Sequence, residues 1–164
     1  MIFDIMTLFP DLVGYVLGES VIGRAQKSGA IEVNCHNIRD YSEDKHRRVD
    51  DYPYGAGGGM VMQPQPIYDA YMSVAEGLSQ KPHTVFLSPQ GKVFDQKKAI
   101  ELSKKDHIVF LCGHYEGVDQ RVLDYWNMEE VSIGDYILTG GELPACILVD
   151  AVSRLIDGVL SDPE

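Results

Sequence analysis

The pattern of apolar and polar positions predicts strands and helices that alternate along the chain. Apolar residues at every second position, or in short runs between turn residues, predict strands over Ile2 to Leu8, Ile31 to Cys35, Thr84 to Leu87 and Ile108 to Cys112. Helical spacing predicts helices over Val21 to Ser28, Pro64 to Glu76, Asp95 to Lys104 and Val118 to Trp126. Gly29 follows the first of these as a C-terminal cap. The alternation favours an α/β fold with a parallel sheet covered on both faces.

A further helix is predicted directly after Gly140-Gly141. Its apolar residues fall on one stripe at helical spacing, made of Leu143, Ile147, Leu148, Ala151, Val152, Leu155 and Ile156. Pro144 suits the first turn, and the N–H groups there can attract a carboxylate. Arg154 lies off the stripe, one turn after Asp150, so an ordinary surface ion pair and a functional role are both open.

The stretch from about residue 39 to residue 63 fits neither pattern. A connection of this length without secondary structure is uncommon in a compact domain and is usually functional or mobile. It contains the basic cluster Lys45-His46-Arg47-Arg48 and, after it, a glycine-rich segment from Tyr52 to Met60. Charge alone favours a solvated loop, whereas positive groups beside aromatic residues and glycines also suit RNA phosphates and bases. Both interpretations stay open at this point.

Three turns rich in glycine and proline follow apolar segments in the second half of the chain. They are Ser88 to Gly91, Cys112 to Gly117 and Ile133 to Pro144. In open α/β sheets a ligand binds beyond the carboxyl ends of the strands, and glycine lets backbone groups approach it closely. The sequence therefore predicts one small-molecule pocket that binds its ligand largely through backbone groups.

Composition narrows the class of protein. The 164 residues, 45% of them hydrophobic, fit one globular domain, and the net charge of −11 opposes long-range attraction of anionic partners. Three cysteines without C-x-x-C spacing predict reduced thiols, and the five histidines show no metal-ligand spacing. Asp4 stands where a secretory signal would be basic, and no apolar run approaches the roughly 20 residues of a membrane span. A cytoplasmic protein without a metal site is expected.

The common phosphate-binding motifs do not match. Gly55 and Gly57 are followed by Met60 rather than by the third glycine of a dinucleotide fingerprint, and the G-x-x-x-x-G-K-[ST] loop is absent. None of the three turns carries a lysine or arginine placed as a phosphate anchor. A ligand with an adenine, an apolar sulfonium and an amino-acid tail suits such loops better, and S-adenosylmethionine has these parts.

Several short segments, taken together and in order, carry a resemblance to a known family. They are Thr7-Leu8-Phe9-Pro10, Arg39-Asp40, Val49-Asp50-Asp51, Pro53-Tyr54-Gly55, Gly59-Met60, Leu87-Ser88-Pro89-Gln90-Gly91, Cys112-Gly113, Tyr115-Glu116-Gly117, Ser132-Ile133-Gly134-Asp135-Tyr136, Gly140-Gly141-Glu142-Leu143-Pro144-Ala145 and Val152-Ser153-Arg154. Across essentially its whole length the chain resembles the N-terminal domain of bacterial tRNA (guanine-N1)-methyltransferases, of the SPOUT class. The resemblance implies a parallel α/β domain with a C-terminal trefoil knot, and a homodimer whose active sites form between the two subunits.

The resemblance also implies an activity and its residues. Methyl transfer from S-adenosylmethionine to N1 of the guanosine 3′ of the anticodon in tRNA would use Arg154 and Glu116 as catalytic residues. A guanidinium at Arg154 would stabilise the negative charge that develops on guanine O6. The implied cofactor-binding residues are Phe86, Leu87, Ser88, Pro89, Gln90, Gly113, Ile133, Gly134, Asp135, Tyr136, Ile137, Leu138, Gly140, Gly141 and Pro144. The implied RNA-binding residues are Lys45, His46, Arg47, Arg48, Asp50, Tyr54, Gly55 and Gly59. The need for a divalent ion is left open.

The end of the chain differs from the family pattern. The resemblance implies a general-base aspartate beyond Glu164, in a linker that leads to a C-terminal tRNA-binding domain. Residues 1–160 are therefore expected to form the methyltransferase domain, and residues 161–164 the start of that linker. We expect a truncated chain that binds the cofactor with little or no turnover.

Two rival interpretations remain at this stage. Cys112 beside His114 can be a nucleophilic pair, although a cysteine that ends an apolar strand is more often part of the core. Alternatively, the chain is a nucleotide-binding or RNA-binding domain without catalysis, in which the region from 45 to 60 recruits a partner.

Overall fold

The computed structural model describes residues 1–51, 61–114 and 117–161. Within them, five parallel strands form one sheet in the order β2-β1-β6-β5-β7. The strands are β1 (Ile2–Thr7), β2 (Glu32–Asn37), β5 (His83–Val93), β6 (His107–Cys112) and β7 (Glu129–Ser132). A small antiparallel ladder joins β3 (Asp50–Asp51) to β4 (Val61–Met62). The expected parallel α/β architecture is confirmed.

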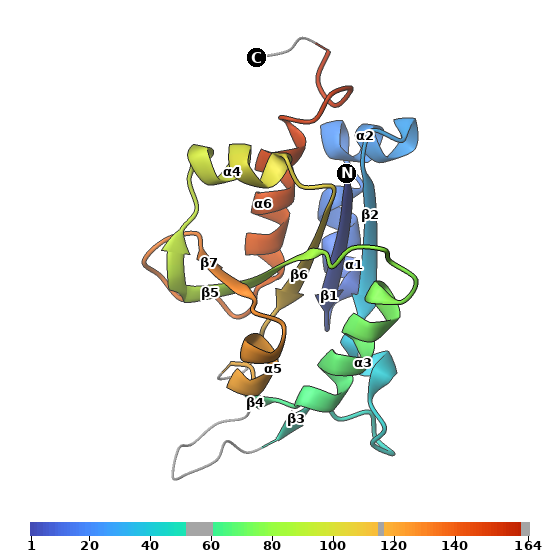
Figure 1. Ribbon diagram of the computed structural model, residues 1–164, viewed down its shortest axis with the longest axis vertical. Helices are drawn as coiled ribbons and strands as arrows, with labels where there is room; N and C mark the ends of the chain where they lie inside the picture. Colours follow the sequence, from blue (N-terminus) through green and yellow to red (C-terminus); the bar gives the residue numbers. More distant parts are fainter. Residues whose placement is uncertain (52–60, 115–116, 162–164) are drawn as a thin grey trace.

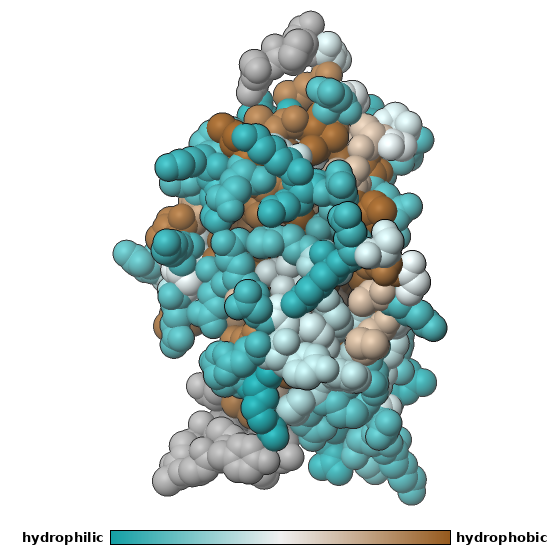
Figure 2. All heavy atoms as spheres, viewed as in Figure 1, coloured by the Kyte–Doolittle hydropathy of each residue, from teal (hydrophilic) through white to brown (hydrophobic). Residues whose placement is uncertain are grey.

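Helices cover both faces of the sheet (Figure 1). One face carries α1 (Pro10–Leu17), α2 (Ser20–Ser28), α4 (Gln96–Ser103) and α6 (Glu142–Ser153). The other carries α3 (Pro64–Ala75), α5 (Gln120–Tyr125) and the short 3-10 helix η1 (Ile38–Tyr41). In the view of Figure 2 the surface between α4 and α3 is mainly hydrophilic. No helix in the described part of the chain is long and apolar enough to cross a membrane.

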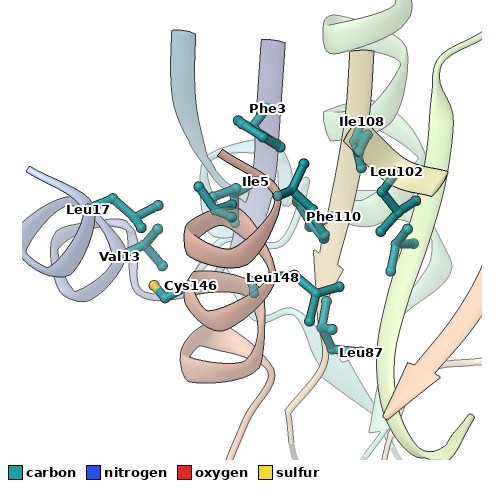
Figure 3. Packing of buried hydrophobic residues seen from close by; sticks show 14 of the residues in the cluster. Phe3, Ile5, Val13, Leu17, Leu87, Leu102, Ile108, Phe110, Cys146 and Leu148 are labelled. Carbon is teal, nitrogen blue, oxygen red and sulfur yellow. The ribbon is translucent and has the colours of Figure 1, made fainter. Parts of the chain in front are cut away.

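Alternate side chains of each central strand enter two separate cores. Phe3 and Ile5 of β1 pack with Phe110 of β6 under α6 and α4, and the rings of Phe3 and Phe110 lie 6.2 Å apart (Figure 3). On the opposite face Met6 and Leu111 pack against α3 and α5. Because both faces are buried, β1 and β6 read as nearly continuous apolar runs, as parallel strands do.

The structure corrects several predicted boundaries. The strand predicted to end at Leu87 continues to Val93 through a register shift between Leu87 and Lys92. The helix predicted over Val118 to Trp126 is shorter, covering only α5. The 39–63 stretch is not wholly irregular, since η1, β3 and β4 lie in it; residues 52–60 are outside the described residues. Gly29 caps α2 as predicted, with φ of 83°.

The predicted stripe on the last helix is partly wrong. Leu148 and Val152 are fully buried, but Leu143 and Ile147 are 49% and 47% exposed. The buried face instead includes the small residues Ala145 and Cys146, which let α6 approach the sheet closely. The two large apolar side chains on α6 therefore form part of an exposed surface rather than of the core.

A buried carboxylate links three strands. Asp4 of β1 is 5% exposed and accepts hydrogen bonds from the Nε2 atoms of His36 on β2 (2.6 Å) and His107 on β6 (2.5 Å). Burial pushes the pKa of Asp4 up, but the hydrogen bonds from the two imidazoles outweigh it and hold the pKa below its ordinary value. Asp4 therefore stays ionised and ties β1 to both of its neighbours, β2 and β6.

We expect Asp4→Asn to destabilise the protein at pH 7 by about 3 kcal/mol, because it removes a buried carboxylate that accepts two hydrogen bonds. A carboxyl whose pKa is lowered by folding adds stability above its unfolded pKa and loses it as the pH falls through the folded value. The variant should therefore lose less stability than the wild type below about pH 4. Urea unfolding at pH 7 and between pH 5 and 3 measures both effects. The exposed Asp157→Asn is the control, and equal acid sensitivity of wild type and Asp4→Asn would contradict the prediction.

Candidate functional site

A cavity of about 370 Å³ lies at the carboxyl ends of β5, β6 and β7. The three predicted turns converge on it, as the sequence led us to expect. Fourteen of the fifteen expected cofactor residues line it: Phe86, Leu87, Ser88, Pro89, Gln90, Gly113, Ile133, Gly134, Tyr136, Ile137, Leu138, Gly140, Gly141 and Pro144. The exception is Asp135, which is exposed in the same loop and is not among the lining residues.

The first wall of the cavity is a bulge inside β5. Leu87 and Lys92 both pair with Val131 of β7, so the residues between them leave the ladder. Ser88, Pro89 and Gln90 of this bulge line the cavity. The strand thus supplies a loop to the site and then resumes pairing with β7, which fixes both ends of that loop.

His114 joins the second wall of the cavity, the turn after β6, to the third wall, the loop that leads into α6. It follows β6, lines the cavity, and its Nε2 lies 2.8 Å and 3.1 Å from the two carboxylate oxygens of Glu142. The ring also stacks at a tilt on Phe9, with centroids 4.9 Å apart. Gly140 packs directly on the ring, because a Cβ there would lie 2.2 Å from Nε2. Only a residue without a side chain fits at position 140 while the ring keeps this place.

Glu142 anchors this arrangement to the first strand. Its side chain is buried at the start of α6, where the helix dipole favours an anion, and the residue is only 2% exposed. Thr7 at the end of β1 donates its hydroxyl to Glu142 Oε1 at 3.1 Å, and the same hydroxyl accepts from the backbone of Phe9. One buried carboxylate therefore holds the ends of β1 and β6 against α6.

The nucleophilic reading of Cys112 does not hold. Cys112 is fully buried, and burial raises the pKa of its thiol well above the ordinary value, with the negative Glu142 adding to the effect. A thiol in this state is a poor nucleophile at neutral pH. His114 meanwhile directs its Nε2 to Glu142. Burial likewise raises the pKa of Cys146 to about 11.

The walls suit an adenosine-like ligand better than a polyphosphate. Apolar side chains such as Phe86, Leu138 and Pro144 alternate with backbone of the three loops, and no lysine or arginine is among the lining residues. Glu130 is the acidic residue among the described lining residues and can attract a positive sulfonium or amine. The residues present therefore fit S-adenosylmethionine. Among the described residues, no group of three or more His, Cys, Asp or Glu side chains is arranged to hold a metal ion.

Arg154, one of the two expected catalytic residues, does not lie at the cavity of its own chain. Arg154 caps the far end of α6, whereas the cavity lies at the beginning of that helix. Twelve residues of helix separate the two ends by about 18 Å (Figure 1). Glu116 lies outside the described residues.

The basic cluster is exposed and partly neutralised by its own neighbours. Arg47 pairs with Asp40 (3.3 Å) and Arg48 with Asp44 (3.4 Å). Backbone N–H groups of His46 and Arg48 hold the pKa of Asp44 below its usual range. Lys45, His46 and Asp50 belong to the same segment, while Tyr54, Gly55 and Gly59 lie outside the described residues.

The base of this segment is tied to the cavity. Met62 of β4 forms a bridge with Val118, and its N–H donates to the carbonyl of Gly117. Gly117 and Val118 both line the cavity. The end of the segment between η1 and α3 therefore lies close to the turn after β6 that lines the site.

Sequence reasoning missed the residues that hold the loops together. Glu142 and Thr7 were not candidates for the site, and His114 entered only as a partner for Cys112. The one available signal was the acidic residue directly after Gly140-Gly141 at a helix start. No spacing rule pairs it with His114, 28 positions earlier, or with Thr7, 135 positions earlier.

Comparison with known proteins gives a consistent family. The family model described as tRNA (Guanine-1)-methyltransferase TrmD matches residues 1–164. The tRNA (guanine-N(1)-)-methyltransferase of Ruminiclostridium cellulolyticum is 62% identical over 161 residues, which are 98% of this chain and 69% of the relative. That of Clostridioides difficile is 52% identical, over 100% of this chain and 71% of the relative. The crystal structure of tRNA (m1G37) methyltransferase from Aquifex aeolicus superposes with a TM-score of 0.90 at 42% identity, covering 99% of this chain and 73% of that one.

Proposed function

Because this chain belongs to the tRNA (guanine-1)-methyltransferase family, of the SPOUT class, we propose that it takes part in methylating N1 of the guanosine 3′ of the anticodon in tRNA, with S-adenosylmethionine as the methyl donor. The single observation that carries the proposal is the cavity at the strand ends, lined by the cofactor residues that the family motifs predicted. A tRNA-modifying enzyme works where tRNA is, so we also propose a cytoplasmic location.

The chemistry divides between the cofactor and the chain. The cofactor supplies an activated methyl group: the carbon–sulfur bond breaks as the bond to guanine N1 forms, and N1 loses its proton to a base. The chain's contribution is mainly positioning, which can supply several kcal/mol of rate enhancement. The loops at Ser88, Gly113 and Gly140 would hold the adenosine, and the contact between His114 and Glu142 would keep two of these loops in register. We assign the base to none of the described residues.

We propose that the working unit is a homodimer whose sites are shared between subunits. Two features support this. Arg154 stands one helix length from the cavity of its own chain, so a partner's Arg154 is the natural source of the guanidinium at O6. In addition, α1 packs on α6, and these helices expose Leu12, Val16, Leu143 and Ile147, each between 45% and 49%. An exposed apolar face of this kind suits contact with a second copy. A trefoil knot in the C-terminal part is proposed with it, from the family.

We assign the segment from Lys45 to Gly59 to tRNA contact. The exposed positive groups of Lys45, Arg47 and Arg48 can meet backbone phosphates. Met62 ties the base of the segment to the cavity wall, so RNA held there would lie close to the methyl donor.

Calorimetric titration of S-adenosylhomocysteine into the purified chain is the first test. We expect saturable binding with a dissociation constant in about the micromolar range, and no binding of ATP or NAD, because the cavity lining lacks the cationic anchors of phosphate sites. The same preparation, given S-adenosylmethionine and tRNA, is assayed for methyl transfer. Absence of binding by a folded, dimeric sample, or equal binding of ATP, would contradict the proposed cofactor.

A further inference from the structure

A second cavity lies at the opposite ends of the strands from the proposed cofactor site. It measures about 620 Å³ and is walled by residues 78–84 before and within β5, residues 104–107 before β6, and the turn of Trp126 and Asn127. Its position is the amino ends of β5 and β6. The six residues of β6 place it about 20 Å from the carboxyl ends that bear the first cavity. The proposed methyltransferase chemistry gives it no role.

This cavity is basic in an acidic protein. Lys81, Lys104 and Lys105 line it, against Asp106 as the acidic lining residue, although the chain carries a net charge of −11. Neither Lys104 nor Lys105 forms an ion pair with a described residue, whereas Lys98 of the same region is paired with Glu101 and Glu129. Lys81 donates one hydrogen bond to the carbonyl of Trp126 at 3.0 Å and keeps two further donors. Cations that the protein itself does not neutralise are available to an external anion.

Two histidines of the lining are fixed in place from behind. His107 donates to the buried Asp4, and His83 donates to Glu129 at 3.1 Å. These carboxylates hold the imidazoles by Nε2, which leaves Nδ1 of each ring for other contacts. The cavity therefore has two histidines held in place in its walls, beside the exposed Lys104 and Lys105.

An aromatic ridge adjoins the basic cavity through Trp126. Tyr68 of α3 and Tyr125 of α5 are 40% and 68% exposed, and their rings lie 5.5 Å and 5.2 Å from that of Trp126. Exposed aromatic rings beside positive groups suit stacked bases and their phosphates, whereas a free small anion gains nothing from the rings. Figure 2 shows mainly hydrophilic side chains on the surface between α4 and α3.

We propose that the cavity and this ridge form a second contact surface for RNA. Lys81, Lys104 and Lys105 take backbone phosphates, and Tyr68 and Tyr125 stack on unpaired bases. The inference rests on the proposed function in one respect: tRNA is taken as the RNA that is bound. It adds to that function a contact remote from the reacting guanosine, which strengthens binding of the substrate without touching the methyl donor.

Paired charge-removing variants test the proposal. Lys104→Gln/Lys105→Gln is compared with Lys27→Gln/Lys97→Gln, which removes the same charge from exposed positions on α2 and α4. Fluorescence anisotropy of labelled tRNA, measured on the whole chain across a salt series, gives the affinity and its salt dependence. We expect the cavity pair to weaken binding by about tenfold at 0.1 M salt and to lower the salt slope by about 1 to 2, with the control pair close to wild type. Tyr125→Ala should weaken binding at least about fivefold, and Tyr125→Phe should restore it.

The outcomes separate this inference from the proposed function. S-adenosylhomocysteine binding is measured on every variant and should not change, because the two cavities lie at opposite ends of the strands. A wild type that does not bind S-adenosylhomocysteine would contradict the proposed function but not the RNA surface. The RNA surface is overturned if the two lysine pairs behave alike, or if the wild type binds no tRNA. It is also overturned if inorganic phosphate shifts the NMR resonances of the cavity lysines in the wild type while Lys104→Gln/Lys105→Gln keeps full affinity for tRNA. In that case the cavity binds a small anion and not RNA.

Discussion

Arg154→Ala is expected to lower the single-turnover rate of methyl transfer by about 100- to 1,000-fold, the loss typical of removing one group that stabilises a developing oxyanion. Guanine N1 loses its proton as it attacks the methyl carbon, and the resulting negative charge is shared with O6. A guanidinium stabilises that charge more in the transition state than in the bound substrate. Affinity for S-adenosylhomocysteine should stay at the wild-type value, since Arg154 lies at the far end of α6 from the cavity. Equal rates for wild type and variant would remove Arg154 from the reaction.

A mixture of two inactive proteins tests whose arginine acts at which site. One is Arg154→Ala, and the other is Gly140→Ala, whose pocket should not bind the cofactor because the added Cβ would overlap the ring of His114. In a shared site, a mixed dimer combines the intact pocket of the first with the intact arginine of the second. After the two variants have exchanged subunits in equal amounts, the mixture should show about one quarter of wild-type activity. Half of the dimers are then mixed, and each mixed dimer has one complete site of its two. No recovery in a sample proven to contain mixed dimers would show that pocket and arginine act within one subunit.

Gly140→Ala is expected to weaken S-adenosylhomocysteine binding by at least about 100-fold. The new Cβ would lie 2.2 Å from Nε2 and 2.5 Å from Cε1 of His114. The free chain can relieve this overlap by moving the loop at 139–141 away from the ring. The ligand then binds only after the loop has been forced back, and a cost of about 3 kcal/mol corresponds to the stated loss. Calorimetry on the variant measures it.

A double-mutant cycle separates this steric cause from general damage. His114→Ala removes the ring that the new Cβ would meet, so adding Gly140→Ala to it should change the affinity by less than about threefold. His114→Ala should by itself reduce stability, since it leaves the buried Glu142 without its imidazole partner. An equally large effect of Gly140→Ala in both backgrounds would mean that the ring and residue 140 are not in conflict.

The core strands could be predicted from the sequence because their neighbours bury them on both sides. Val85, Phe86 and Val109 stand in short unbroken apolar runs, as expected of strands that are buried on both faces. The edge strand β7 gave no such signal, since it begins with Glu129 and Glu130. Burial pushes the pKa of Glu129 up, but Lys98 at 2.8 Å and His83 outweigh it and keep the carboxyl ionised. That compensation comes from distant segments, so only the fold reveals it.

The turns that line the candidate site could be predicted from the sequence, whereas the contacts between distant side chains that hold these turns in place could not. Glycine and proline mark the loops that line the cavity, and their position after strands placed them at one edge of the sheet. The buried face of α6 was misjudged because a stripe of large residues outweighed Ala145 and Cys146, whose small size allows close packing. The distance of Arg154 from the cavity of its own chain depends on the length of α6, which a motif does not convey.

The hydrogen bond between Thr7 and Glu142 has a consequence for synthesis on the ribosome. β1 is among the first segments made, yet the helix that covers Phe3 and Ile5 begins 135 residues after Thr7. At about 5–20 residues per second, β1 waits roughly 7 to 27 s before synthesis of α6 begins. During that time the nascent chain exposes an apolar strand face that nothing already synthesised can fully cover. This protein should therefore depend on holding factors at the ribosome more than a protein whose first strand is fully covered by helices close to it in the sequence, and its yield should fall when translation slows before residue 142.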